Sequence, residues 1–178
     1  MEAGCPALTV LGGDKTVGAP RCVPHGYMLR QRLRERFPDL LLGGWANPHR
    51  DGAEQAAFLE DPDLTADFYL TQVVSHHDLP AVEAFLDQTR RRGIELPGIF
   101  GVFFYRSANA ATLARLSDFI PVPTEGITRD FQSGQNAIEI CAKTVRALRD
   151  LGANKVYISN LHPDLAGHQL AAIDALAR

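Results

Sequence analysis

The segment Asp67–Val74, which reads DFYLTQVV, decides the fold class of this 178-residue chain. Its apolar residues follow one another without regular alternation, which is typical of a strand buried on both faces of a sheet. Four other segments have the same character, namely Ala7–Gly12, Leu40–Ala46, Pro97–Tyr105 and Asn154–Asn160. Such strands belong to parallel sheets covered by helices, so the sequence predicts five strands of a parallel sheet.

Apolar residues at helical spacing lie between these strands. They form three sets: Leu29, Leu33 and Phe37; Val82, Phe85, Leu86 and Thr89; and Ile138, Cys141, Val145 and Leu148. We interpret Asp78 as the N-cap of the second helix, which has Pro80 in its first turn. The longer interval from Phe119 to Ser133 is expected to hold an inserted loop. Strand and helix alternate about every 30 residues, which predicts an α/β protein.

Composition and charge exclude several classes of partner. The chain has 18 Lys and Arg against 21 Asp and Glu, a formal net charge of -3, so it lacks the basic excess that nucleic-acid binding needs. Its apolar segments are shorter than the ~18 residues of a membrane helix. Three widely spaced cysteines suit a reducing compartment. We therefore expect a single cytoplasmic domain with no nucleic-acid or membrane partner.

Two architectures remain open at this point: a doubly wound open sheet and part of a (β/α)8 barrel. A complete barrel needs about 250 residues, and five strand–helix units in 178 residues fall short of that. Length alone therefore favours the open sheet.

Unusual polar residues follow the predicted strands, where both architectures place their chemistry. Gly12, Gly13 and Asp14 follow the first strand, and Trp45 and His49 mark the end of the second.

Gln72 lies inside the third predicted strand. A buried amide without partners costs ~1–3 kcal/mol, so Gln72 is either satisfied within the core or faces a ligand at the strand end.

The run His76-His77-Asp78 suggests a metal site. Adjacent side chains on a strand point to opposite faces, so only one of the two histidines is expected to face a common centre. We therefore predict no metal site. A GxSxG motif is absent and no cysteine follows a strand, so nucleophilic catalysis has little support.

An ordered set of segments carries a family resemblance: Leu8–Asp14 (LTVLGGD), Gly44–His49 (GWANPH), Ala66–Gln72 (ADFYLTQ) and Leu96–Ile99 (LPGI). In order and spacing they resemble strands four to eight of methylenetetrahydrofolate reductase, and the similarity extends from about Ala7 to Leu161. The resemblance implies a (β/α)8 barrel of TIM type, with about five of the eight β/α units forming a single partial domain over residues 1–178. This expectation replaces the open sheet.

The resemblance also implies an activity. The family reduces 5,10-methylenetetrahydrofolate to 5-methyltetrahydrofolate with a reduced nicotinamide cofactor, NADH or NADPH, normally through FAD. By resemblance, Asp14 and Gln72 bind the folate substrate. The cofactor-binding residues implied in the same way are Gly12, Gly13, Asp14, Trp45, His49 and Gln72.

Two departures from the family pattern argue against its usual FAD anchorage. Gly12 replaces an arginine, and Glu60-Asp61 replace the Arg-Lys pair that grips the flavin diphosphate. We therefore expect direct hydride transfer from the nicotinamide. The family's catalytic acid, a glutamate, comes from strands that precede these segments, so no catalytic residue is assigned.

Two other functions stay open, and one expectation concerns assembly. The chain could be a non-catalytic folate-binding or subunit-interaction remnant of a barrel. A metal-dependent barrel hydrolase is the third hypothesis. Because a five-stranded sheet leaves its outer strands unpaired, we expect a homo-oligomer.

Overall fold

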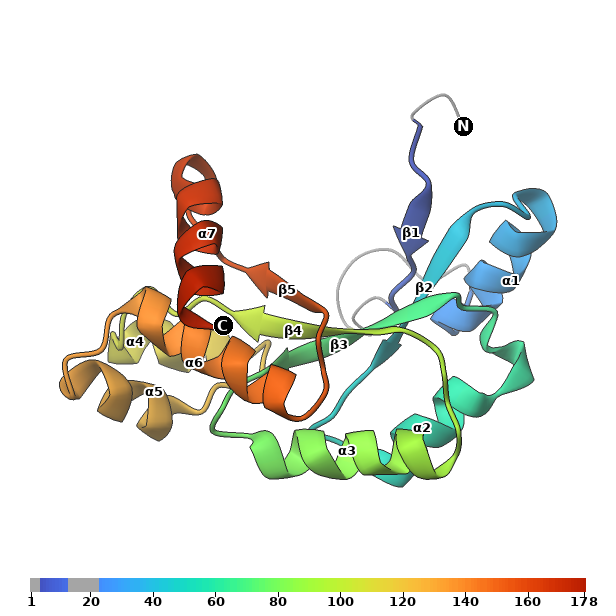
Figure 1. Ribbon diagram of the computed structural model, residues 1–178. Helices are drawn as coiled ribbons and strands as arrows, with labels where there is room; N and C mark the ends of the chain where they lie inside the picture. The colour runs from blue at the N-terminus through green and yellow to red at the C-terminus, as the bar shows by residue number, and fades with distance from the viewer. Residues whose placement is uncertain (1–3, 13–22) are drawn as a thin grey trace.

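The structure is a computed structural model, and it describes residues 4–12 and 23–178. Within these residues, five strands form one parallel sheet in the order β1-β2-β3-β4-β5 (Figure 1). The strands are β1 (Ala7–Thr9), β2 (Leu41–Ala46), β3 (Phe68–Val74), β4 (Gly98–Phe103) and β5 (Val156–Ser159). Each lies inside a segment that the sequence predicts as a strand. The predicted α/β class with a parallel sheet is therefore confirmed.

Helices connect the strands and lie along the outside of the sheet (Figure 1). They are α1 (Gly26–Arg36), α2 (Gly52–Glu60), α3 (Leu79–Arg91), α4 (Ala110–Ser117), α5 (Thr124–Gln132), α6 (Ala137–Asp150) and α7 (Ala166–Leu176), with short 3-10 turns at Pro62–Leu64 and Pro163–Leu165. A capping box starts α6, because Asn136 and Glu139 satisfy each other's backbone N–H groups. Beyond α3, Gly93 adopts a φ of 64°, which suits glycine.

The loop expected between Phe119 and Ser133 is wrong, because α5 occupies most of that interval. The helix buries Ile127 and Asp130 on one side, while most of its other residues are polar. Its N-cap, Pro123, offers no side-chain cap, so the sequence carries no clear start signal for this helix.

The main core lies between the sheet and the helices α3 and α6. Phe85 of α3 is fully buried, and its ring meets those of Tyr69 and Phe100 edge to face, at centroid distances of 6.1 and 6.3 Å. Val145 and Leu148 of α6 complete the same cluster. This core fixes β3 and β4 in place, and with them the loops that follow these strands.

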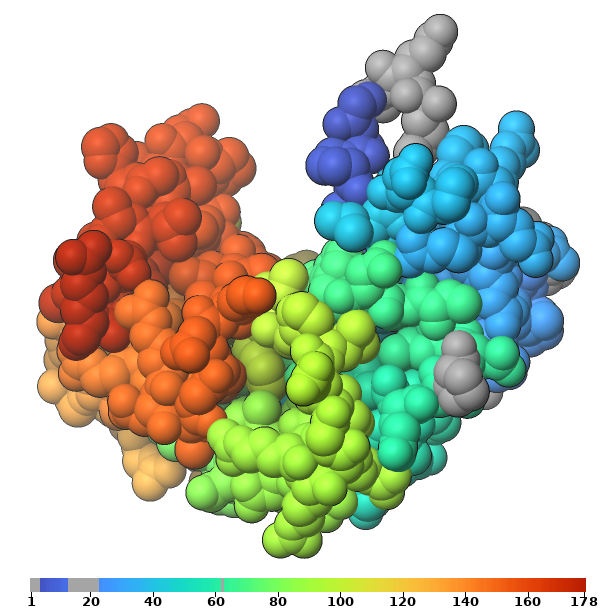
Figure 2. Space-filling model, turned by 45° about the vertical axis from the view of Figure 1, so that its right-hand side comes forward, coloured from blue at the N-terminus to red at the C-terminus, as the bar shows by residue number. Residues whose placement is uncertain are grey.

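The sheet is curled, and its two faces differ. Tyr69 packs against α3, so the alternating residues Phe68 and Leu70 lie on the opposite face, where they are half-buried. Figure 2 shows an open notch between α7 on one side and β1 and β2 on the other. The prediction that all five strands are buried on both faces is therefore wrong, since no second layer covers the inner face within the described residues.

The strand order bears on the architecture. Each strand pairs with the next one in sequence, from β1 through β5, without the reversal of order that defines a doubly wound sheet. Among the described residues, β1 pairs only with β2 and β5 only with β4, so the sheet does not close. Among those same residues, no helix is both long and apolar enough to span a membrane.

Candidate functional site

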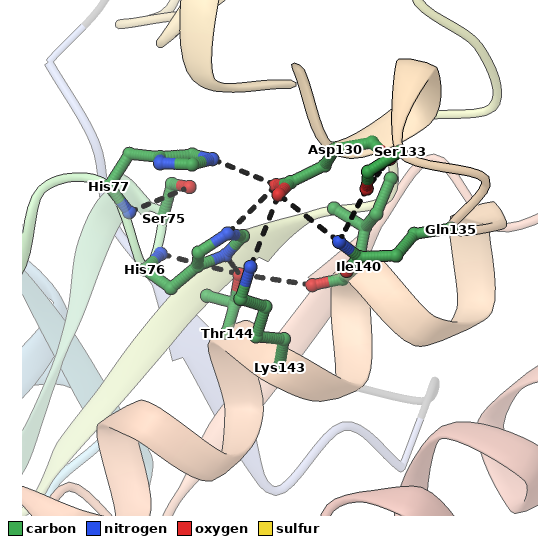
Figure 3. Close-up of polar contacts among 9 residues, drawn as sticks. All are labelled: Ser75, His76, His77, Asp130, Ser133, Gln135, Ile140, Lys143 and Thr144. Atoms are coloured by element: carbon green, nitrogen blue, oxygen red, sulfur yellow. Dashed lines mark hydrogen bonds and ion pairs between the residues drawn. The ribbon is translucent and has the colours of Figure 1, made fainter. Parts of the chain in front are cut away.

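Polar side chains from three segments meet beyond the carboxyl end of β3 (Figure 3). His76 and His77 follow this strand directly, Asp130 lies in the last turn of α5, and Lys143 and Thr144 lie in α6. In parallel α/β proteins, ligands bind at the carboxyl ends of the strands. The position of this cluster therefore makes it a candidate functional site.

The cluster is centred on one carboxylate. The Nε2 atoms of His76 and His77 each lie 2.9 Å from Oδ2 of Asp130, and Nζ of Lys143 lies 3.1 Å from Oδ1. The two imidazole rings are tilted against each other with centroids 4.0 Å apart. Both histidines thus face a common centre.

The expectation that the two histidines point apart is therefore wrong. β3 ends at Val74, and the next residues form a turn in which the N–H of Asp78 donates to the carbonyl of Ser75 at 2.9 Å. Alternation between faces holds for extended backbone and not for a turn.

The charges in the cluster are largely balanced. Burial alone would raise the pKa of Asp130, but hydrogen bonds from His77 and Lys143 outweigh it and lower the pKa. Burial, aided by the charges of His77 and Lys143, lowers the pKa of His76 to about 4. His76 is therefore neutral at neutral pH: its Nε2–H donates to Asp130, and its Nδ1 accepts from the Thr144 hydroxyl at 2.8 Å.

The backbone of α5 is shaped to admit His77. A Cβ atom added to Gly126 would lie 2.6 Å from carbon atoms of the His77 ring, closer than such contacts allow. Glycine at this position therefore lets the imidazole lie against the helix and reach Asp130 one turn later.

Replacing Gly126 with alanine is expected to lower the free energy of unfolding by about 1–3 kcal/mol, because the ring or the helix must shift. Gly167, in the first turn of α7, provides the matched control, since a Cβ there meets nothing within 4 Å. Gly167→Ala should stabilise the protein by about 0.5–1 kcal/mol. Urea unfolding of both variants measures the difference. Equal stabilisation by both would show that His77 does not pack on α5.

Asp78 lies at the N-cap position of α3, as the sequence predicts, but the expected side-chain cap is absent. Its side chain makes no capping hydrogen bond, and its Oδ2 is buried without a partner among the described residues. Burial raises the pKa of Asp78, against the charges of His49 and His77. Burial also raises the pKa of Tyr105, and the charge of Asp78 adds to this shift. The unpaired Oδ2 of Asp78 therefore lies near His49, His77 and Tyr105, which follow β2, β3 and β4.

The residues implied as binding residues fall in separate places. Gly12 and Trp45 line a pocket of about 480 Å³, together with Arg30 and the carboxylates Asp61 and Asp63. The predicted site residues Gly13 and Asp14 lie outside the described part of the chain.

His49 and Gln72 meet at the backbone of Val73 and do not line this pocket. His49 Nε2–H donates to the Val73 carbonyl at 2.8 Å, and the Val73 N–H donates to Oε1 of Gln72 at 2.9 Å. The pairing of β3 with β4 shifts register between Leu70 and Val73, and the pairing of β3 with β2 extends only to Thr71. The amide oxygen of Gln72 is thus already paired, and its amide nitrogen is the group left to contact a ligand.

The pocket does not fit the flavin diphosphate. Asp61 and Asp63 bring negative charge to it, and Arg30 is already engaged with the carbonyls of Leu64 and Val10. Glu60, the other residue at the position of the family's cations, pairs with Arg92 at 2.8 Å. The described residues therefore lack the paired cations that the family uses for FAD.

Sequence reasoning missed Asp130, Lys143 and Thr144. Asp130 lies 53 residues after His77, in the interval interpreted as a loop. Lys143 and Thr144 are adjacent in α6, but only the packing of this helix shows that Thr144 faces His76 and that Lys143 faces Asp130.

Comparisons with known proteins leave the family open. A scan against family models finds no match, and a search of curated proteins finds no relative. Among solved structures, the chain is similar to a complete multifunctional pyruvate carboxylase from Rhizobium etli, with a TM-score of 0.43 and 11% identity. The match covers 86% of this chain and 16% of that chain, so this chain spans less than a fifth of that protein's length.

Proposed function

We propose that this protein is an oxidoreductase of one-carbon folate metabolism. It reduces 5,10-methylenetetrahydrofolate to 5-methyltetrahydrofolate with NADH or NADPH. One observation carries the proposal: the segments that resemble methylenetetrahydrofolate reductase lie on neighbouring parallel strands in the order of the sequence. Sequential order is the order of a (β/α)8 barrel, so we also propose that the chain represents about five of its eight units.

The inner face of the sheet suits two stacked rings. Phe68 and Leu70 offer half-buried apolar surface there, and the half-buried Gln72 follows two residues later with its amide nitrogen left to donate to a ligand. Hydride passes from the nicotinamide to the methylene carbon of the folate, the bond from that carbon to N10 breaks, and N10 gains a proton. The chain's contribution is to align the two rings and to exclude water between them.

The proposed reaction does not use FAD. The pocket beside Gly12 and Trp45 contains two aspartates where the flavin diphosphate needs cations. We therefore expect a colourless protein whose reductase activity does not depend on added FAD.

The proposal extends to the partners and the compartment. The edges of β1 and β5 have no paired strand among the residues that the structure describes, and this favours a homo-oligomer. The absence of a basic excess argues against nucleic acid. The folate is the small-molecule partner, and the cytoplasm is the compartment where it and the reduced nicotinamide meet.

A non-catalytic folate-binding or subunit-interaction module is the second candidate. The open notch of the curled sheet favours it, because the pocket of a barrel remnant stays accessible (Figure 2). Tight binding of the folate without turnover of NADH or NADPH would distinguish this function from the reductase.

Gln72→Ala tests the proposed site. Loss of the amide donor is expected to weaken folate binding by about 1–3 kcal/mol. The Val73 N–H loses its partner as well, so the thermal midpoint should fall modestly. Calorimetric titration with the folate gives the affinity, and NADH oxidation without added FAD gives the activity. Gln132→Ala, at an exposed position of α5, is the control. Equal affinity in the two variants would remove Gln72 from the site, and a flavin absorption band in the purified protein would refute direct transfer.

A further inference from the structure

We infer that His76, His77 and Asp130 form a binding site for one divalent transition-metal ion, with Zn²⁺ the best fit. Two imidazole nitrogens and one carboxylate oxygen lie within 4.8 Å of one another. These groups come from the turn after β3 and from α5 (Figure 3). The site is separate from the proposed folate contacts at Gln72.

The distances from the carboxylate oxygen to the two imidazole nitrogens are close to those of a zinc site. Asp130 Oδ2 lies 2.9 Å from Nε2 of His76 and 2.9 Å from Nε2 of His77. Tetrahedral zinc with bonds of ~2.0–2.1 Å holds its ligands about 3.3 Å apart. Shifts of a few tenths of an ångström at Asp130 therefore open the space for the ion.

The hydrogen bonds around these ligands resemble those that orient the ligands of known metal sites. A ligating His76 carries its proton on Nδ1, where the Thr144 hydroxyl lies at 2.8 Å and can accept it. Thr144 can then donate to the carbonyl of Ile140, 3.4 Å away. Oδ2 of Asp130 is the oxygen that faces both imidazoles, whereas Lys143 lies beside Oδ1.

The donor set selects the class of ion. Two nitrogens and one oxygen suit Zn²⁺ and its neighbours in the transition series, whereas Mg²⁺ and Ca²⁺ prefer oxygen ligands. The side chain of His77 is 21% exposed, which leaves a route for a water molecule as fourth ligand. The charge of Lys143 opposes the ion, but its side chain is 48% exposed and can turn to solvent.

Titration of the purified, tag-free protein with ZnCl₂ tests the site. We expect one equivalent to bind, and Co²⁺ in its place to give the intense visible absorption of tetrahedral coordination. His77→Gln keeps a hydrogen-bond donor but loses the imidazole ligand. Its Zn²⁺ affinity should therefore fall by about 10-fold to 100-fold. Lys143→Met removes the opposing charge and should tighten binding by about tenfold.

His162→Gln is the matched control, because His162 is exposed in the loop after β5. Its Zn²⁺ affinity should equal that of the unmodified protein. Zn²⁺ should also raise the thermal midpoint of the unmodified protein and of His162→Gln, but not that of His77→Gln. Equal Zn²⁺ affinity in His77→Gln and the unmodified protein, or weaker binding in Lys143→Met, would overturn the proposal. Neither result bears on folate binding, so the two proposals fail independently.

Discussion

Replacing Phe85 with alanine is expected to lower the free energy of unfolding by about 3–5 kcal/mol. The side chain is fully buried, and its ring contacts Tyr69 of β3 and Phe100 of β4 edge to face. Truncation removes both aromatic contacts and leaves a cavity between α3 and the sheet, which rigid strands can close only in part. Urea unfolding followed by circular dichroism measures the change.

Two exposed phenylalanines serve as controls for this substitution. Phe58 of α2 is 53% exposed and Phe119 is 79% exposed, so alanine at either position should change the stability by less than about 0.5 kcal/mol. A Phe85→Ala variant as stable as these two would mean that α3 does not pack on the sheet as described.

The strands could be predicted from the sequence because strands that pack against helices contain runs of consecutive apolar residues. The runs around Leu42, Tyr69 and Phe100 are continuous in apolar residues, and each forms a strand of the parallel sheet. The exposed inner face could not be predicted in the same way. Phe68 and Leu70 are apolar although they face no second layer in the described residues, and a run of apolar residues does not say how many of its faces are covered.

The cluster at Asp130 could not be predicted because its parts are joined only by packing. His76 and His77 are visible as a pair in the sequence, but their common direction depends on the turn that begins at Ser75. The partner carboxylate lies in α5, a short helix with a polar majority and no capping signal. Local patterns therefore predict elements, whereas this site depends on which elements meet.

The contacts of individual polar residues follow less directly from the sequence than the strands do. Asp78 has the residue type and position of an N-cap, yet its side chain makes no capping bond and retains a buried oxygen without a partner among the described residues. The sequence leaves Gln72 either paired in the core or facing a ligand, and the structure shows its oxygen paired with the Val73 N–H. In both cases the hydrogen-bond partners of the side chain depend on the local backbone geometry, which the residue type alone does not determine.

Replacing Asp130 with alanine is the second substitution with a large expected effect, a loss of about 2–4 kcal/mol of unfolding free energy. The side chain of Asp130 is only 8% exposed and accepts hydrogen bonds from His76, His77 and Lys143. Its removal leaves the Nε2–H of His76 without an acceptor in a site where that side chain is 6% exposed. Lys143 adds little to the loss, because half of its side chain already reaches solvent.

Three further variants separate the hydrogen bonds of Asp130 from its charge and from general effects of losing an aspartate. Asp130→Asn keeps one oxygen as acceptor and should lose less than Asp130→Ala. His77→Ala should also lose less, because Asp130 retains His76 and Lys143 as partners. Asp150→Ala, at the exposed carboxyl end of α6, should be neutral or slightly stabilising, since a negative charge there opposes the helix dipole. Thermal and urea unfolding would rank the four variants, and an Asp130→Ala protein no less stable than Asp150→Ala would show that this carboxylate does not hold α5 and α6 to the end of β3.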